Sequence, residues 1–278
     1  MKRIVTIQDI SCFGKCSLTI ALPVISVMGI ETCVLPTAVL STHTGGFTGY
    51  TFRDLTADIA PIAAHWQSLK LHFDAIYTGY LGSIEQLNAM EHFFDTFGTS
   101  DTLRFVDPVM GDKGKMYSGF APEFAAGMAK LCAKADVIVP NLTEACLLLG
   151  EPYPEKEPTR EFLHALLKRL TTLGCRTAVL TGVMPSPERH GAVAYDSKTD
   201  QFVSYFSEHL PVAFHGTGDL FSSALVGALT RGESMADALK LAVDFVVACI
   251  KNSMDTRESH WYGVEFEECL GLLLPSKA

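Results

Sequence analysis

Short runs of β-branched and other apolar residues alternate with longer segments in which apolar residues recur every three or four positions. The short runs predict strands and the longer segments predict helices. Such alternation is typical of βαβ units and of a mostly parallel sheet with helices on both faces. Strands are expected at residues 3–7, 32–35, 74–78, 103–106, 136–139 and 177–180. Helices are expected at residues 17–28, 53–71, 83–97, 122–133, 143–149, 218–230, 235–252 and 265–274.

Two further strands interrupt this alternation near the middle of the chain. Residues 192–195 and 201–206 flank a polar stretch at residues 196–200, which predicts an antiparallel hairpin at the edge of the sheet. Three prolines within residues 151–160 predict a surface loop between two helices rather than a linker, because the alternation resumes beyond them. We therefore predict an α/β fold, a doubly wound and mostly parallel sheet flanked by helices, with one domain over residues 1–278.

The composition narrows the classes of partner. A net charge of -9 argues against a nucleic-acid groove and against an anionic membrane surface. The longest apolar stretch, residues 18–30, contains Pro23 and is shorter than the roughly 18 residues that a bilayer requires. The eight cysteines are scattered without a CxxC pair, which favours reduced thiols over a disulfide framework. We expect a cytoplasmic protein that binds neither nucleic acid nor a membrane.

The sharpest chemical motif is Gly216, Thr217, Gly218 and Asp219, directly before an apolar helix. Backbone N–H groups in such a turn converge on an anion, and the helix dipole favours negative charge there. A carboxylate in a first turn can serve the helix dipole alone. Inside an anion cradle, however, it also suits phosphoryl transfer, because the amides stabilise the moving phosphoryl group while the carboxylate accepts the proton of the attacking hydroxyl.

Further polar residues follow the predicted strands, where α/β sheets bind their ligands. Asp107 and Asp112 follow the strand at residues 103–106 and either hold hydrated Mg²⁺ beside a nucleotide phosphate or are ordinary turn residues. Asn141 and Glu144 have the spacing of a helix capping box. The functional alternative is that both point into the same cleft as Asp107 and order metal-bound water.

Two loops complete the list of candidate segments. Residues 41–49 are rich in hydroxyls and glycine and would clamp a small polar ring, with Phe47 or Tyr80 over its face. Residues 111–119 contain Lys113 and Lys115 and are either a mobile lid over a nucleotide or a solvated loop. The GxxxxGK[ST], HExxH and GxSxG patterns are absent from the sequence, as is GxGxxG after the first strand.

Taken in chain order, these segments resemble the pyridoxal kinase (vitamin B6 kinase) family of the ribokinase-like superfamily. The resemblance runs from residue 4 to about residue 250, and its last motif, Gly216 to Phe221, marks the superfamily. Two pieces are more specific to the pyridoxal branch, residues 43–45 and 78–80. The matching segments are residues 7–8, 42–45, 78–80, 107–112, 140–144 and 216–221.

The resemblance implies ATP-dependent phosphorylation of the 5′-hydroxymethyl group of pyridoxal, pyridoxine or pyridoxamine. It assigns Asp219 as the general base and Gly216, Thr217 and Gly218 as the anion hole. The vitamer would lie among Asp9, His43, Thr44 and Tyr80. The nucleotide would lie among Asp107, Asp112, Val139, Asn141, Glu144 and Thr181, with Asp107 and Glu144 beside Mg²⁺. Family members often require K⁺ and often form homodimers, which we expect here as well.

Two positions depart from the family pattern. Asp9 stands where the family usually has a serine that touches the pyridine ring, so a protonated ring nitrogen or an aminomethyl group would be favoured, and pyridoxamine would be preferred. Val139 stands where some members have a threonine near the cation or nucleotide, which bears on the K⁺ requirement. The alternatives are a hydroxymethylpyrimidine kinase of the same fold and a non-catalytic nucleotide- or vitamer-binding protein. The latter would have no use for a base at Asp219.

Overall fold

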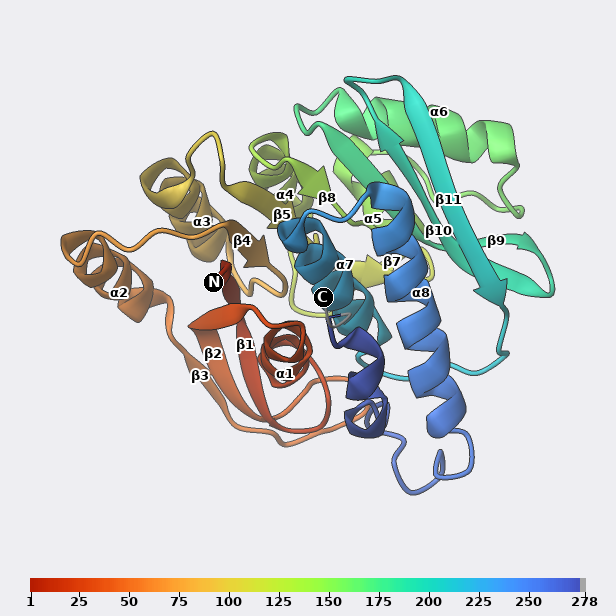
Figure 1. The fold of residues 1–278 in the computed structure, drawn as a ribbon, viewed down its shortest axis with the longest axis horizontal. Coiled ribbons are helices and arrows are strands. Elements are labelled where there is room, and N and C mark those ends of the chain that lie inside the picture. Colours follow the sequence, from red (N-terminus) through yellow and green to blue (C-terminus); the bar gives the residue numbers. More distant parts are fainter. Residues whose placement is uncertain (276–278) are drawn as a thin grey trace.

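The structure is a computed structural model that describes residues 1–275. Its main sheet contains β1 (Arg3–Phe13), β2 (Glu31–Thr42), β3 (Phe52–Asp54), β4 (Ala75–Thr78), β5 (Leu103–Val106), β8 (Val137–Ile138), β9 (Thr177–Ser186), β10 (Arg189–Asp196) and β11 (Gln201–Glu208). These nine strands lie in the order β11-β10-β9-β8-β5-β4-β1-β2-β3 (Figure 1). The six strands from β2 to β9 in this order are parallel, and β3 and β10 are antiparallel to their neighbours.

Helices cover both faces of the sheet (Figure 1). One face packs against α1 (Leu18–Val27), α7 (Thr217–Arg231) and α8 (Met235–Asn252). The other face packs against α2 (Thr56–Ser68), α3 (Ile84–Phe97), α4 (Glu123–Ala133), α5 (Leu142–Leu149) and α6 (Arg160–Thr171). A short 3-10 helix, Glu267–Leu273, follows α8. The predicted α/β fold with a mostly parallel sheet is confirmed.

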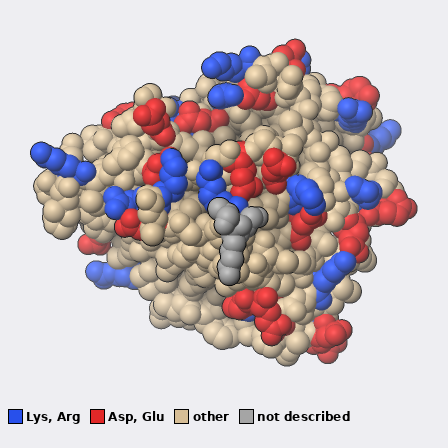
Figure 2. Space-filling model, in the orientation of Figure 1, with Lys and Arg blue, Asp and Glu red and all other residues tan. Residues whose placement is uncertain are grey.

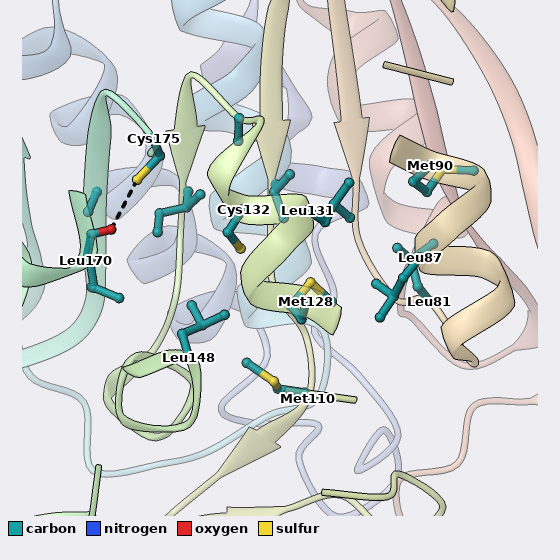
Figure 3. Packing of buried hydrophobic residues seen from close by; sticks show 14 of the residues in the cluster. Leu81, Leu87, Met90, Met110, Met128, Leu131, Cys132, Leu148, Leu170 and Cys175 are labelled. Atoms are coloured by element: carbon teal, nitrogen blue, oxygen red, sulfur yellow. Dashed lines mark hydrogen bonds between the residues drawn. The ribbon is translucent and has the colours of Figure 1, made fainter. Parts of the chain in front are cut away.

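The core divides into two apolar layers because the central strands are buried on both faces. The layer under α2 to α6 is built from aliphatic, sulfur-containing and aromatic side chains, of which Figure 3 labels Leu81, Leu87, Met90, Met110, Met128, Leu131, Cys132, Leu148, Leu170 and Cys175. The Cys175 thiol donates a 3.6 Å hydrogen bond to the Leu170 carbonyl. All eight cysteines are unpaired thiols, and those at Cys132, Cys146, Cys175 and Cys249 serve as small buried apolar residues.

The edges of the sheet differ from the sequence-based expectation. The predicted hairpin is confirmed as β10 and β11, but β9 continues through Thr181 to Ser186 because it pairs with β10. The expected helix at residues 53–71 begins only at Thr56, since Phe52–Asp54 instead pairs with β2 as an edge strand. β1 was expected to end at residue 7 and extends to Phe13, with a shift in register between Gln8 and Ile10.

Charged side chains of both signs are interspersed over the surface drawn in Figure 2. Lysine and arginine side chains lie beside acidic ones rather than gathering into a positive area on this face. Among the described residues, ion pairs join oppositely charged side chains such as Lys134 and Asp95, or Arg176 and Asp196. Within residues 1–275, no helix combines the length and the apolar character that crossing a bilayer requires.

Candidate active site

The candidate site is centred on the start of α7. Gly216 is the N-cap residue, with φ 85° and ψ −3°, a left-handed conformation that glycine adopts without strain. A Cβ atom at Gly216 would lie 2.2 Å from the backbone oxygen of Lys15, so residues 14–17 pass directly over the helix start. Thr217 Oγ1 donates a 3.4 Å hydrogen bond to the Phe214 carbonyl. Gly218, in contrast, is exposed, and a Cβ atom there would meet nothing within 4 Å.

A polar stripe runs down α7 from Asp219. Ser222 and Ser223 lie three and four residues after Asp219, which places all three on one face of the helix. Ser222 Oγ donates a 2.7 Å hydrogen bond to Oδ2 of Asp107, at the end of β5. This hydrogen bond joins Asp107 to α7, the helix that begins at the Gly216–Asp219 motif, although the two are far apart in the sequence.

The environment of Asp219 suits a general base. Burial, aided by the negative charge of Asp9, raises the pKa of this carboxyl to about 7, although a hydrogen bond from the Ser17 backbone opposes the shift. A base with a pKa near the working pH is both deprotonated and sufficiently basic to accept a proton. The position of Asp219 in the first turn of α7 also places it beside the backbone N–H groups of that turn.

Two more carboxylates are buried near this helix start. Burial and the charge of Asp219 raise the pKa of Asp107 to about 8, although the hydrogen bond from Ser222 lowers it. Burial and the charge of Asp107 raise the pKa of Glu144. Within residues 1–275, neither carboxylate forms an ion pair with a lysine, an arginine or a histidine. Buried charges without a partner are strongly unfavourable, so these residues fit a bound cation.

The chemistry of this pair fits Mg²⁺ in particular. Mg²⁺ is commonly bound through one or two carboxylates, with water and substrate phosphates completing the shell. Among the described residues there is no cluster of three or more His, Cys, Asp or Glu side chains that would hold a metal ion by themselves. Asp107 and Glu144 would therefore hold the cation together with the phosphates, and it would neutralise charge on the transferred group. Asp112 is exposed and accepts a 2.8 Å hydrogen bond from the Lys113 N–H.

Asn141 and Glu144 form the capping box that their spacing predicted. Asn141 Oδ1 accepts a 3.0 Å hydrogen bond from the Glu144 N–H, and Glu144 Oε2 accepts one of 2.9 Å from the Asn141 N–H. Both residues also reach beyond α5, because Glu144 Oε1 accepts from the Met110 N–H at 3.2 Å. Asn141 Nδ2 donates to the Gly111 carbonyl at 2.9 Å. Asn141 and Glu144 therefore cap α5 and, through the same two side chains, hold the segment after β5 in place.

The segment at residues 111–119 contains a small hairpin that the sequence did not predict. β6 (Gly111–Asp112) pairs with β7 (Lys115–Met116), and the Gly114 N–H donates a 2.8 Å hydrogen bond to Thr143 Oγ1 on α5. Lys113, in the turn between β6 and β7, is exposed. The base of the hairpin is thus held beside the candidate metal residues.

Asp9 lies close enough to His43, Tyr80 and Asp219 for their charges to interact, which groups three of the residues expected around the vitamer with the candidate base. Asp9 is buried within β1 and accepts a 3.0 Å hydrogen bond from Ser11 Oγ, and burial raises the pKa of its carboxyl. Burial and the charge of Asp9 together raise the pKa of Tyr80, whose half-buried ring lies 5.8 Å from that of Phe120. Thr44 is exposed in the loop after β2. These side chains form a polar and aromatic surface next to the candidate base.

Both ring nitrogens of His43 have hydrogen-bond partners in the backbone. Its Nε2 lies 2.7 Å from the carbonyl oxygen of Tyr262, and its Nδ1 accepts a 3.1 Å hydrogen bond from the Gly45 N–H. This pattern places the proton of the neutral ring on Nε2. Both ring nitrogens are therefore occupied by backbone groups, and the buried ring lies 5.0 Å from the ring of Phe47 and 5.0 Å from that of His215.

Val139 and Thr181 lie near the start of α5: Val139 directly follows β8, and Thr181 lies within the neighbouring strand β9. The Val139 N–H donates to the Val106 carbonyl at 3.0 Å, and the Thr181 N–H donates to the Pro140 carbonyl at 3.0 Å. The Val139 side chain is buried in the apolar layer under α1, α7 and α8. Only its backbone is thus available to a nucleotide or a cation.

Comparisons with known proteins identify the family. The family model described as phosphomethylpyrimidine kinase matches residues 21–263. The chain belongs to the phosphomethylpyrimidine kinase family. It is 38% identical to a candidate phosphomethylpyrimidine kinase from Bacteroides thetaiotaomicron, crystallised with pyridoxal, with a TM-score of 0.93 and coverage of 100% of this chain and 97% of that one.

Pyridoxal kinases are similar to this member of the family over nearly its whole length. The pyridoxal kinase of Lactobacillus plantarum is 32% identical, with a TM-score of 0.90 and coverage of 98% of this chain and 96% of that one. A pyridoxine/pyridoxal/pyridoxamine kinase from Bordetella bronchiseptica is 26% identical over 91% of this chain and 89% of its own. The predicted resemblance to pyridoxal kinases, the ribokinase-like fold and the enzyme class, a kinase, are confirmed.

Sequence reasoning missed three contributors to the site of this family member. Ser222 looked like one polar residue in an apolar helix, but its spacing from Asp219 could have placed it on the same face. Ser17 was expected only as the start of a helix, yet its backbone contacts Asp219. Tyr262 contributes a backbone carbonyl, which no side-chain pattern reveals.

Proposed function

We propose that this protein transfers the γ-phosphoryl group of ATP to the 5′-hydroxymethyl group of a vitamin B6 vitamer, pyridoxal, pyridoxine or pyridoxamine. The observation that carries the proposal is the carboxylate of Asp219, half-buried in the first turn of α7 with its pKa raised to about 7. It accepts the proton of the 5′-hydroxyl as the oxygen attacks the γ-phosphorus, and ADP leaves. The backbone N–H groups of Gly216, Thr217 and Gly218 stabilise the negative charge on the transferred phosphoryl group.

The vitamer ring lies among Asp9, His43, Thr44 and Tyr80. The pyridoxal in the related Bacteroides crystal structure supports a pyridine ring as substrate. Asp9 is a buried carboxylate whose pKa is raised by burial, so a protonated ring nitrogen or an aminomethyl group stabilises its charged form. This environment favours pyridoxamine. Equal ratios of kcat/KM among the three vitamers in the parent and in Asp9→Ser would contradict this preference.

The nucleotide lies on the side of Asp107, Asn141 and Glu144, with Asp112, Val139 and Thr181 around it. Mg²⁺ bound between the phosphates and the carboxylates of Asp107 and Glu144 compensates their buried charge. A monovalent cation such as K⁺ and a homodimeric state complete the proposal. Both are tested directly, by assays with and without K⁺ and by light scattering of the purified protein.

Hydroxymethylpyrimidine is the second candidate substrate, because the family model that matches the chain is described as phosphomethylpyrimidine kinase. Both substrates are aromatic nitrogen rings that carry a hydroxymethyl group, so one base serves both reactions. Residues 42–45 and Tyr80, which resemble the pyridoxal branch of the superfamily, favour a B6 vitamer. A non-catalytic binding protein is disfavoured because the base and the anion hole are both present in α7.

A coupled ATPase assay across pyridoxal, pyridoxine, pyridoxamine and hydroxymethylpyrimidine, each with and without K⁺, tests the proposal. We expect turnover with at least one B6 vitamer at a higher kcat/KM than with hydroxymethylpyrimidine. Asp219→Asn should lower kcat by about 10²-fold or more, because it removes the general base. Turnover restricted to hydroxymethylpyrimidine, or an unchanged kcat in Asp219→Asn, would contradict it.

A further inference from the structure

The segment between α8 and the last 3-10 helix, residues 254–266, has so far contributed only the Tyr262 carbonyl to the site. We call it the C-terminal loop. It is an ordered excursion with its own hydrogen bonds: Thr256 Oγ1 donates to Glu265 Oε2 at 2.8 Å, and the Glu265 N–H donates to Ser253 Oγ at 2.8 Å. His260 Nδ1 lies 3.3 Å from Glu265 Oε1. The loop is therefore held in one shape at its base.

The tip of the C-terminal loop packs on two aromatic residues of the vitamer side. The Trp261 ring lies 4.6 Å from that of Phe47, and the Tyr262 ring lies 4.7 Å from that of Phe13. Phe47 belongs to the loop that carries His43. A Cβ atom at Gly46 would lie 2.7 Å from the Trp261 ring, so the two loops are in close contact.

A second set of contacts joins the C-terminal loop to the catalytic centre. A Cβ atom at Gly263 would lie 2.6 Å from Cβ of Lys15, and one at Gly216 would lie 2.2 Å from the Lys15 backbone oxygen. The segment at residues 14–17 is thus packed between the C-terminal loop and the start of α7. Its last residue, Ser17, contacts Asp219 through the backbone. Displacement of the loop would therefore loosen the vitamer side of the site.

The aromatic side chains of this region are more exposed than a packed cluster requires. Trp261 is 43% exposed and Phe13 is 51% exposed. Large aromatic rings usually bury most of their surface, and they pack favourably against other aromatic rings. The planar ring of a vitamer bound beside Asp9 and His43 would cover part of this surface.

We infer that the C-terminal loop is the outer wall of the vitamer site, with Trp261 as a residue that determines affinity for the substrate ring. His43 is a positioning residue that holds this wall in place through its hydrogen bond to the Tyr262 carbonyl. The inference rests on the proposed function, since it assigns a wall to the ring that the proposal places there.

Kinetics of Trp261→Ala test the wall. We expect KM for the vitamer to rise about fivefold to tenfold, as expected from the loss of about 1 kcal/mol of ring contact, with kcat and KM for ATP within about twofold of the parent. Met254→Ala is the matched control, because Met254 lies in the same loop and is 46% exposed but is not one of the residues placed at the site. Its vitamer KM should not change. An unchanged vitamer KM in Trp261→Ala, or an equal rise in Met254→Ala, would overturn the assignment.

The role of His43 is tested without turnover. The chain has two tryptophans, so Trp66→Phe leaves Trp261 as the only one. In that background we expect His43→Ala to increase quenching of Trp261 fluorescence by acrylamide, and His43→Gln, which can donate to the Tyr262 carbonyl, to restore part of the protection. Equal quenching in the parent and in His43→Ala would overturn the positioning role.

A double variant separates positioning from direct ring contact. If His43 acts through the wall, His43→Ala combined with Trp261→Ala should raise vitamer KM no more than the stronger single change. Multiplied effects would mean that the two side chains act independently, against the inference. If no B6 vitamer is phosphorylated yet His43→Ala still exposes Trp261, the proposed function fails while the contact between the loops stands.

Discussion

Asp219→Asn should make the protein more stable while lowering its kcat by about 10²-fold or more. Burial and the charge of Asp9 raise the pKa of Asp219 from 3.8 to about 7, a difference of about 3 units. One unit corresponds to about 1.36 kcal/mol, so ionised Asp219 destabilises the folded protein by at most about 4 kcal/mol. Because the side chain is partly accessible to solvent, we expect about 2–4 kcal/mol of this to be regained by the neutral amide.

The gain in stability from Asp219→Asn should increase as the pH rises. The folded protein binds the Asp219 proton more tightly than the unfolded chain does, because its pKa is raised on folding. Below about pH 4 the carboxyl is protonated in both states and the destabilisation is absent, whereas above about pH 7 it is complete. Urea denaturation of parent and variant should therefore show a larger difference at about pH 8 than at about pH 5. The parent's kcat/KM should rise with pH through about pH 7, as the base loses its proton.

Asp58→Asn is the matched control for this experiment. Asp58 also lies in the first turn of a helix, α2, but its side chain is exposed. Its replacement should lower stability by about 0.3–1 kcal/mol through the helix dipole and leave kcat unchanged. A gain in Asp219→Asn that is equal at both pH values, or no gain at about pH 8, would refute the electrostatic argument.

Two further predictions use the loops around α7 and α5. Gly218→Ala should fold like the parent yet lose about tenfold or more in kcat, because its Cβ enters open space above the helix start. Gly216→Ala should instead fail to fold stably, since an alanine there would combine a φ of 85° with a close contact to the Lys15 backbone. Thermal unfolding and kcat of both variants check these expectations. Full activity of Gly218→Ala would mean that the phosphoryl group does not bind above the helix start. Asn141→Ala should cost about 1–2 kcal/mol and raise KM for ATP, because both the capping box and the bond to the Gly111 carbonyl are lost. An unchanged KM for ATP, measured with denaturation, would restrict Asn141 to capping.

The parallel core of the sheet was predictable because its strands are buried on both faces and read as apolar runs. β5 and the start of β9 illustrate this, and their expected and observed first residues agree. The edges were not predictable in the same way. Phe52–Asp54 becomes a strand only because Ala38–Leu40 offers a free edge, and β9 continues through Thr181 because β10 folds back on it. Such pairings depend on distant partners rather than on local pattern.

The same division holds for the site. The rule that ligands bind at strand ends placed Asp107, Asn141 and Asp219 at one edge of the sheet, and the structure brings these elements together there. The hydrogen bond from Ser222 to Asp107 needed the packing of α7 on β5. The two backbone partners of His43 also needed the tertiary fold, because one of them comes from residue 262. The side chains of the site could be predicted from the sequence, whereas the backbone groups that contact them could not.

The acidic character of the chain acquires a specific meaning at this site. Asp9, Asp107, Glu144 and Asp219 are grouped around the start of α7, and burial together with a neighbouring carboxylate raises the pKa of Asp107, Glu144 and Asp219. A nucleotide that arrived without a cation would add its own negative charge to this group, which the backbone amides of α7 alone would not balance. The site should therefore take up the nucleotide as its magnesium complex, because the ion stabilises the carboxylates and the phosphates at once. An excess of acidic residues is thus compatible with binding a phosphate donor, provided that the cation arrives with it.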